Sequence, residues 1–151
     1  MDRLEETLFN TSLRTFEELA FFMPVPEENP DTVESKQVMT CVDYQGFSEG
    51  SLYISVTEGL LPVLAQNILA EDDIPAEQQL DALKEIANVI CGNLLPTLAG
   101  GDKKYRLKTP EIVTAINPVF QGDDFDFKEC VFYFYEGTVK LSWYYNKTKI
   151  S

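Results

Sequence analysis

The sequence contains no histidine. This absence excludes Ser-His and Cys-His catalytic pairs, the usual zinc sites and phosphotransfer through histidine. Cysteine is also scarce, because Cys41, Cys91 and Cys130 lie far apart and form no Cys-x-x-Cys pair. Three isolated cysteines do not make a disulfide framework. We interpret them as small core residues of a protein that resides in a reducing compartment.

Positive charge is the second shortage. The 151 residues include 12 Lys or Arg against 25 Asp or Glu, which gives a net charge of −13. Such a chain should repel nucleic acids and anionic lipids. No apolar run approaches the roughly 20 residues of a membrane-spanning helix, and the charged start lacks the apolar core of a signal peptide. We therefore expect a cytoplasmic protein in which residues 1–151 form a single domain.

The apolar pattern predicts a short series of helices and strands. Helical periodicity covers residues 4–23, 58–69 and about 75–95, with Thr57 as the expected N-cap of the second helix. Alternation predicts strands at 38–44, 51–57, 111–116, 130–135 and 138–145, and residues 103–106 are assigned to a loop. Because the strands come in hairpins, we expect an α+β fold of two layers, with a mainly antiparallel sheet and helices packed on one face.

The helix predicted near residues 75–95 carries a polar stripe. Asp81, Glu85 and Asn88 are spaced i, i+4 and i+7, and Gly92 continues the stripe one turn later. The opposite arc is apolar and reads as a core face; it comprises Leu80, Leu83, Ile86, Ala87, Ile90, Cys91, Leu94 and Leu98. An acid and an amide on an exposed ridge could enter a partner's pocket, and a glycine leaves room for close approach. From spacing alone, an ordinary solvated helix face is the commoner explanation.

This helix resembles the signature of the CheC/CheX phosphatases of bacterial chemotaxis and related two-component signalling. Their pattern is Asp or Ser, three residues, Glu, two residues, Asn and, about 22 residues later, Pro. Asp81, Glu85 and Asn88 match in register, and Pro110 follows after 21 residues, one fewer than in the pattern. The predicted helix at 4–23 has no Glu-x-x-Asn, so the chain is more similar to the single-motif CheX type than to CheC-like members with two motifs.

The resemblance implies a phosphatase that accelerates hydrolysis of the phospho-aspartate of a CheY-like response-regulator receiver domain. It implies that Asn88 positions the attacking water, that Glu85 docks on the receiver's lysine, and that Asp81 and Gly92 contact the partner. The receiver would supply Mg²⁺, so we expect no metal or other cofactor held by this chain alone. CheX-like proteins pair edge strands into a continuous sheet, which implies a homodimer.

Other classes of function stay open at this point. A paired-carboxylate hydrolase needs two acids across a cleft, whereas Asp81 and Glu85 share one helix. A non-catalytic receiver-binding or structural module, similar to FliM, would lack the Glu-x-x-Asn pair that this chain keeps. The acidic runs 71–73 and 123–126 lack the glycine and closing Glu of a calcium loop, so we expect a helix start and a polar turn there.

Overall fold

The computed structural model describes residues 2–26, 36–99 and 104–149. Its helices are α1 (Arg3–Ala20), α2 (Leu60–Leu69), α3 (Ala76–Leu94) and α4 (Pro96–Ala99), together with the 3₁₀ helix η2 (Pro118–Gln121). Its strands are β1 (Gln37–Gly46), β2 (Gly50–Thr57), β3 (Tyr105–Leu107), β4 (Glu111–Val113), β5 (Phe125–Phe134) and β6 (Gly137–Asn146).

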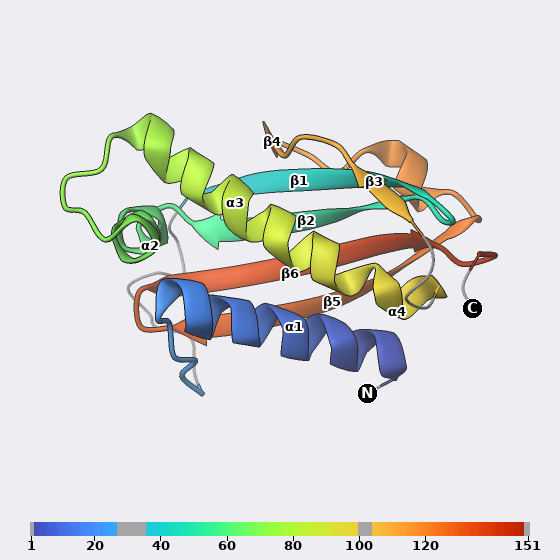
Figure 1. The fold of residues 1–151 in the computed structure, drawn as a ribbon, viewed down its shortest axis with the longest axis horizontal. Helices are drawn as coiled ribbons and strands as arrows, with labels where there is room; N and C mark the ends of the chain where they lie inside the picture. Colours follow the sequence, from blue (N-terminus) through green and yellow to red (C-terminus); the bar gives the residue numbers. More distant parts are fainter. Residues whose placement is uncertain (1, 27–35, 100–103, 150–151) are drawn as a thin grey trace.

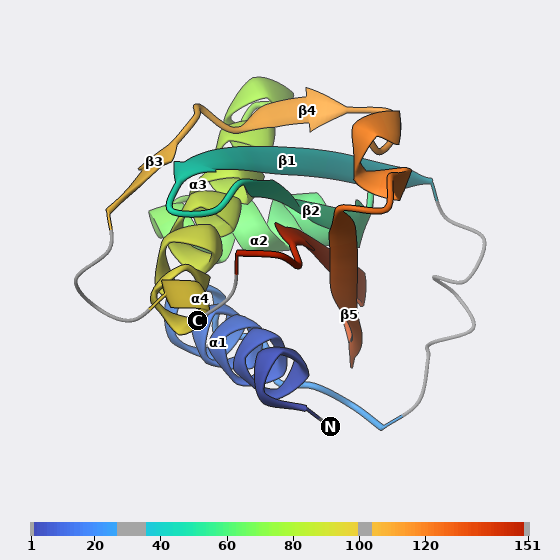
Figure 2. The same ribbon diagram turned by 90° about the vertical axis from the view of Figure 1, so that its right-hand side faces the viewer.

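A single six-stranded antiparallel sheet organises these elements. The strand order is β3-β1-β2-β6-β5, and β4 pairs with a separate part of β1. Two long hairpins, β1–β2 and β5–β6, meet where β2 pairs with β6. Helices α1 and α3 lie side by side across one face of the sheet, with α2 near one end (Figures 1 and 2). The predicted α+β fold with two layers is confirmed.

The core lies between the helices and one face of the sheet. Because successive side chains of a strand point to opposite faces, alternate residues of the central strands are fully buried there, including Leu52, Ile54 and Trp143. Burying one such aliphatic side chain contributes about 1.5–3 kcal/mol. The helices are therefore held against this face by many separate contributions of that size.

Helix α3 buries the predicted apolar arc. Leu83, Ile86, Ile90 and Leu94 have no exposed surface and belong to the main core cluster. Pro96 follows the helix and begins the short helix α4, as expected for a residue that cannot continue the preceding hydrogen-bond pattern. Burial of the apolar arc fixes the rotation of α3 about its own axis, and that rotation determines which side chains face solvent.

The structure corrects several details of the sequence-based prediction. Thr57 does not cap α2; it ends β2, and its hydroxyl accepts a hydrogen bond from the Thr138 amide at 3.0 Å. The residue at the N-cap of α2 is Gly59, which has no side chain to offer. The predicted strand at 111–116 ends at Val113, and part of the predicted loop at 103–106 is strand β3. Residues 100–103 lie outside the described part of the chain.

Candidate functional site

The polar stripe of α3 faces outward. Asp81, Glu85, Asn88 and Gly92 are all exposed, while the residues between them are buried or half-buried. We call these four residues the α3 ridge. Both the acid and the amide are therefore reachable by a partner, as the proposed chemistry requires. The ridge stands on a helix whose other side is locked in the core, so its side chains start from a rigid backbone.

A groove runs along one flank of the α3 ridge. Helix α3 forms one wall, and the segment 107–110, from the end of β3 towards β4, forms the other. The groove has a volume of about 420 Å³, and its lining residues are Asp81, Lys84, Glu85, Asn88, Leu107, Lys108, Thr109 and Pro110. The fold thus places Pro110, the proline that follows the motif in the sequence, beside the motif in space.

The polar groups of the ridge are largely uncommitted. Asp81 approaches Lys84 at 3.9 Å, and their side chains are 69% and 34% exposed. An ion pair of that kind is worth about 0–1 kcal/mol and is easily exchanged for another partner. Within the described residues, the side chains of Glu85 and Asn88 form no hydrogen bond or ion pair. Both therefore can bind an external group without first breaking an internal contact.

Gly92 leaves open space at the end of the ridge. A Cβ built on this residue would meet no atom within 4 Å, apart from its own chain neighbours and the nearby helix backbone. Its backbone does not adopt a positive φ, in contrast to Gly46 and Gly137. Neither packing nor backbone geometry inside the protomer therefore requires a glycine at this position. The empty volume is available to a surface that approaches from outside.

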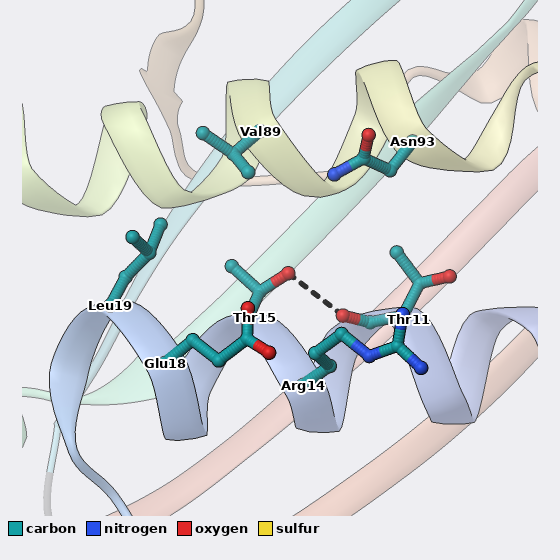
Figure 3. Close-up of a pocket in the computed structure, with 7 residues that line it drawn as sticks. All are labelled: Thr11, Arg14, Thr15, Glu18, Leu19, Val89 and Asn93. Carbon is teal, nitrogen blue, oxygen red and sulfur yellow. Dashed lines mark hydrogen bonds between the residues drawn. The ribbon is translucent and has the colours of Figure 1, made fainter.

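A second groove lies on the other flank of α3, against α1 (Figure 3). Val89 and Asn93 of α3 line this groove together with Thr15 and Leu19 of α1. The Thr15 hydroxyl donates to the Thr11 carbonyl oxygen at 2.8 Å, so that polar group is already satisfied within its own helix. The α1 side of the groove offers no amide or acid–amide pair like that of the ridge.

The surroundings of the cysteines do not favour a catalytic role. Burial raises the pKa of Cys91 to about 12 and that of Cys41 to about 11. A thiol with so high a pKa is a poor nucleophile near neutral pH. The interpretation as core residues agrees with the burial of Cys41 and Cys91, whereas Cys130 is half-buried at the edge of the main core.

In the ranges 2–26, 36–99 and 104–149, no group of three or more His, Cys, Asp or Glu side chains is arranged to hold a metal ion. No helix within the same ranges is long and apolar enough to cross a bilayer.

The structure adds groove residues that sequence reasoning missed. Lys84, Lys108 and Thr109 line the same groove as Glu85 and Asn88, yet none was singled out from the sequence. Lys84 had a detectable signal, since it lies three residues after Asp81 and one before Glu85. Lys108 and Thr109 had none, because only the pairing of β3 with β1 brings that segment to α3.

The chain is similar to proteins of one family in sequence and in fold. A sequence model of the family described as "Chemotaxis phosphatase CheX" matches residues 38–122, more than half of the chain. No curated protein matches the chain significantly. Among solved structures, the chemotaxis protein CheX from Vibrio vulnificus is similar with a TM-score of 0.72 and 18% identity, covering 95% of this chain and 97% of that one.

Two further structures share the fold over nearly their full lengths. CheX from Desulfovibrio desulfuricans matches with a TM-score of 0.68 and 15% identity, covering 94% of this chain and 98% of that one. The complex of CheX with CheY, BeF₃ and Mg²⁺ from Borrelia burgdorferi contains a chain that matches with a TM-score of 0.63 and 16% identity. The match covers 93% of this chain and 96% of that one.

Proposed function

The chain belongs to the CheX family of chemotaxis phosphatases, and from this premise we propose that it hydrolyses the phospho-aspartate of a CheY-like receiver domain. The observation that carries the proposal is the α3 ridge, where Glu85 and Asn88 are exposed, uncommitted and fixed on a buried helix. The Borrelia CheX was solved in complex with CheY, which supports a receiver domain as the partner. We also propose that the protein acts in the cytoplasm.

We assign Asn88 to the attacking water. Its amide offers one acceptor oxygen and two N–H donors, so it can hold a water molecule in a defined direction. It cannot serve as a general base, because an amide does not titrate near neutral pH. The water oxygen forms the new bond to phosphorus while the bond from phosphorus to the aspartyl oxygen breaks. The products are inorganic phosphate and a free aspartate, and the water's proton leaves to phosphate or solvent. Alignment is the contribution of Asn88.

Glu85 lies one turn before Asn88 on the same side of α3. We propose that its carboxylate pairs with the lysine of the receiver's active site and so sets how deeply the helix enters. Asp81 and Gly92 extend the contact in both directions along the ridge. Asp81 would bind at the rim, and Gly92 would let the receiver's surface come close to the helix.

We propose that the Mg²⁺ needed for phosphoryl transfer belongs to the receiver. The Borrelia complex contains Mg²⁺ together with BeF₃ and CheY. A divalent ion on the receiver neutralises charge on the phosphoryl oxygens, while this chain contributes the amide and the carboxylate.

We further propose that the protein forms a homodimer through strand β5. Among the described strands, β5 is at one end of the sheet order and spans ten residues, whereas β3 and β4 at the other end span three each. Phe127 and Val131 of β5 are 47% and 40% exposed. A long open edge with exposed apolar residues is suited to pairing with a second copy. At one end of the edge, the Val25 amide donates to the Tyr133 carbonyl oxygen.

The test is a phosphate-release assay with a CheY-type receiver that has been phosphorylated by a small-molecule phosphodonor. We expect Asn88→Ala to lower kcat by about 100-fold, equivalent to about 2.7 kcal/mol, as for the loss of one positioning group. The matched control is Asn93→Ala, because Asn93 is an exposed amide on the same helix that faces α1 instead. Asn93→Ala should keep nearly full activity. Near-wild-type turnover by Asn88→Ala would refute the mechanism.

The same assay separates catalysis from simple binding. Glu85→Ala should weaken affinity for the receiver activated with BeF₃ and Mg²⁺, whereas Asn88→Ala should leave that affinity nearly unchanged. If the wild-type protein binds the activated receiver but does not accelerate phosphate release, the chain is a non-catalytic receiver-binding module. That result would favour the FliM-like alternative over the phosphatase.

A further inference from the structure

Strand β3 and its flanks carry a concentration of positive charge. Lys104, Arg106 and Lys108 are all exposed and alternate with Tyr105 and Leu107. Because Tyr105 and Leu107 pack against the main core, strand alternation places the three cations together on the other side of the strand. We call Lys104, Arg106 and Lys108 the basic wall. It supplies three of the 12 cations of a chain whose net charge is −13.

In the part of the chain that the structure describes, the cations of the basic wall are not held in ion pairs. Among the described residues, none of the three forms an ion pair within 4.0 Å, in contrast to Lys128, which contacts Asp2 at 2.6 Å. Lys104 and Arg106 line a hollow of about 380 Å³ whose other lining residues are uncharged. An exposed cation without a local partner in so acidic a protein leaves its charge available to an external ligand.

One end of the basic wall, at Lys108, reaches the groove beside the α3 ridge. Lys108 lines the groove that contains Glu85 and Asn88, opposite Lys84 of α3. The groove therefore holds two lysines against two acids, so it is locally balanced although the whole chain is strongly negative. Lys108 also lines a second hollow, which contains Asp43, Glu49 and Asp124.

We propose that the basic wall binds the acidic rim around the phosphorylated aspartate of the receiver. This inference rests on the proposed function and names the surface that makes docking possible. A phosphoryl group with its neighbouring carboxylates stays negative when one divalent ion offsets part of its charge, and a partner with 25 acids would otherwise repel it. Cations beside the point of entry reverse that repulsion locally. They raise the association rate and fix orientation more than they alter the chemical step.

Lys36, at the other end of β1, provides a matched control for the change in net charge. Lys36 is exposed and precedes the first residue of β1, whereas β3 pairs with the far end of that strand, at Tyr44–Gly46. Pro110 lines the groove and precedes Glu111, which pairs with Cys41. The five residues of strand from Lys36 to Cys41 span about 17 Å, about twice the Debye length of about 8 Å at physiological ionic strength. Lys36→Glu and Lys108→Glu thus change the net charge equally, but Lys108→Glu changes the field at the groove far more.

The experiment measures kcat/KM against the phosphorylated CheY-type receiver at 50 mM and 500 mM salt. We expect Lys108→Glu to lower kcat/KM about fivefold at low salt, with kcat nearly unchanged, and to approach wild type at high salt. Lys104→Glu should show a smaller loss of the same kind. Lys36→Glu should match wild type at both salt concentrations. Circular dichroism verifies that each variant is folded.

Two results would refute the proposal that the basic wall binds the receiver. One is an equal loss in Lys108→Glu and Lys36→Glu, which would assign the effect to net charge alone. The other is wild-type kinetics in both Lys108→Glu and Lys104→Glu while Asn88→Ala still lowers kcat about 100-fold. In that case the phosphatase assignment stands and only the docking surface is wrong. Wild-type kinetics in Asn88→Ala would instead remove the proposed function on which this inference depends.

Discussion

Replacement of Gly92 by alanine separates folding from docking. Gly92 is the third residue from the end of α3, and a methyl group there would meet open space. In a helix interior, alanine is more favourable than glycine by about 1 kcal/mol. Because α4 follows closely and the backbone is helical through Leu95, we expect most of that gain to be realised. A gain of about 1 kcal/mol raises the Tm of a protein of this size by roughly 2–4 °C.

The same methyl group should impair the reaction. If the receiver's surface lies against Gly92, an added methyl must be accommodated by movement of one partner. Overpacking of a close contact costs about 1–3 kcal/mol. At about 1.4 kcal/mol the affinity falls tenfold, so we expect KM to rise by roughly that factor. The value of kcat should fall much less, because Asn88 remains in place.

The assays are thermal unfolding and phosphate release on the same protein samples. Gly59→Ala serves as the control, because a Cβ at Gly59 also meets no atom within 4 Å and its helical φ of −66° suits alanine. Gly59 precedes α2 and lines neither side of the α3 ridge, so its substitution should leave KM unchanged. A Gly92→Ala protein with raised Tm and unchanged KM would show that no partner approaches this part of the helix.

Two further predictions concern assembly and the thiols. The double substitution Phe127→Lys and Val131→Lys should convert a dimer to monomers in light scattering after size exclusion, because like charges would face each other across paired β5 edges. The control is Ile112→Lys, at an exposed residue of β4, which should leave the protein dimeric. A wild-type protein that is monomeric, or a double variant that stays dimeric, would contradict the β5 interface. Burial raises the folded-state pKa of Cys91 and Cys130 from 9.0 to about 12, so both should react slowly with a thiol reagent at pH 8 and speed up on denaturation. The free energy of unfolding should fall as the pH rises above 9, because the thiols of the unfolded chain ionise first. Rapid labelling of the folded protein would contradict the burial of these thiols.

Much of the fold could be predicted because its signals are local. The apolar arc of α3 repeats at the helical period, and its residues are buried in the structure except Leu80, which is half-buried. Strands β2 and β6, one from each long hairpin, alternate apolar and polar residues over most of their length. Where the local signal is weak, prediction failed. Strand β3 has three residues and a basic flank, and it becomes a strand only because the edge of β1 provides hydrogen-bond partners. Thr57 had a plausible capping role, yet its pairing partner, Thr138, lies 81 residues away.

For the candidate site, the sequence by itself determined the ridge. One helix carries Glu85 and Asn88, so their spacing in the chain is enough to place them on one side. Only the tertiary structure decided what stands beside that ridge. Lys108 and Pro110 line the same groove as Asn88 because β3 pairs with β1 and β1 packs against α3, and no periodicity in the chain predicts that arrangement. Helical geometry is a local property, so the spacing of residues along the chain reveals it. The position of segment 107–110 opposite α3 depends instead on the packing of a core to which the whole chain contributes.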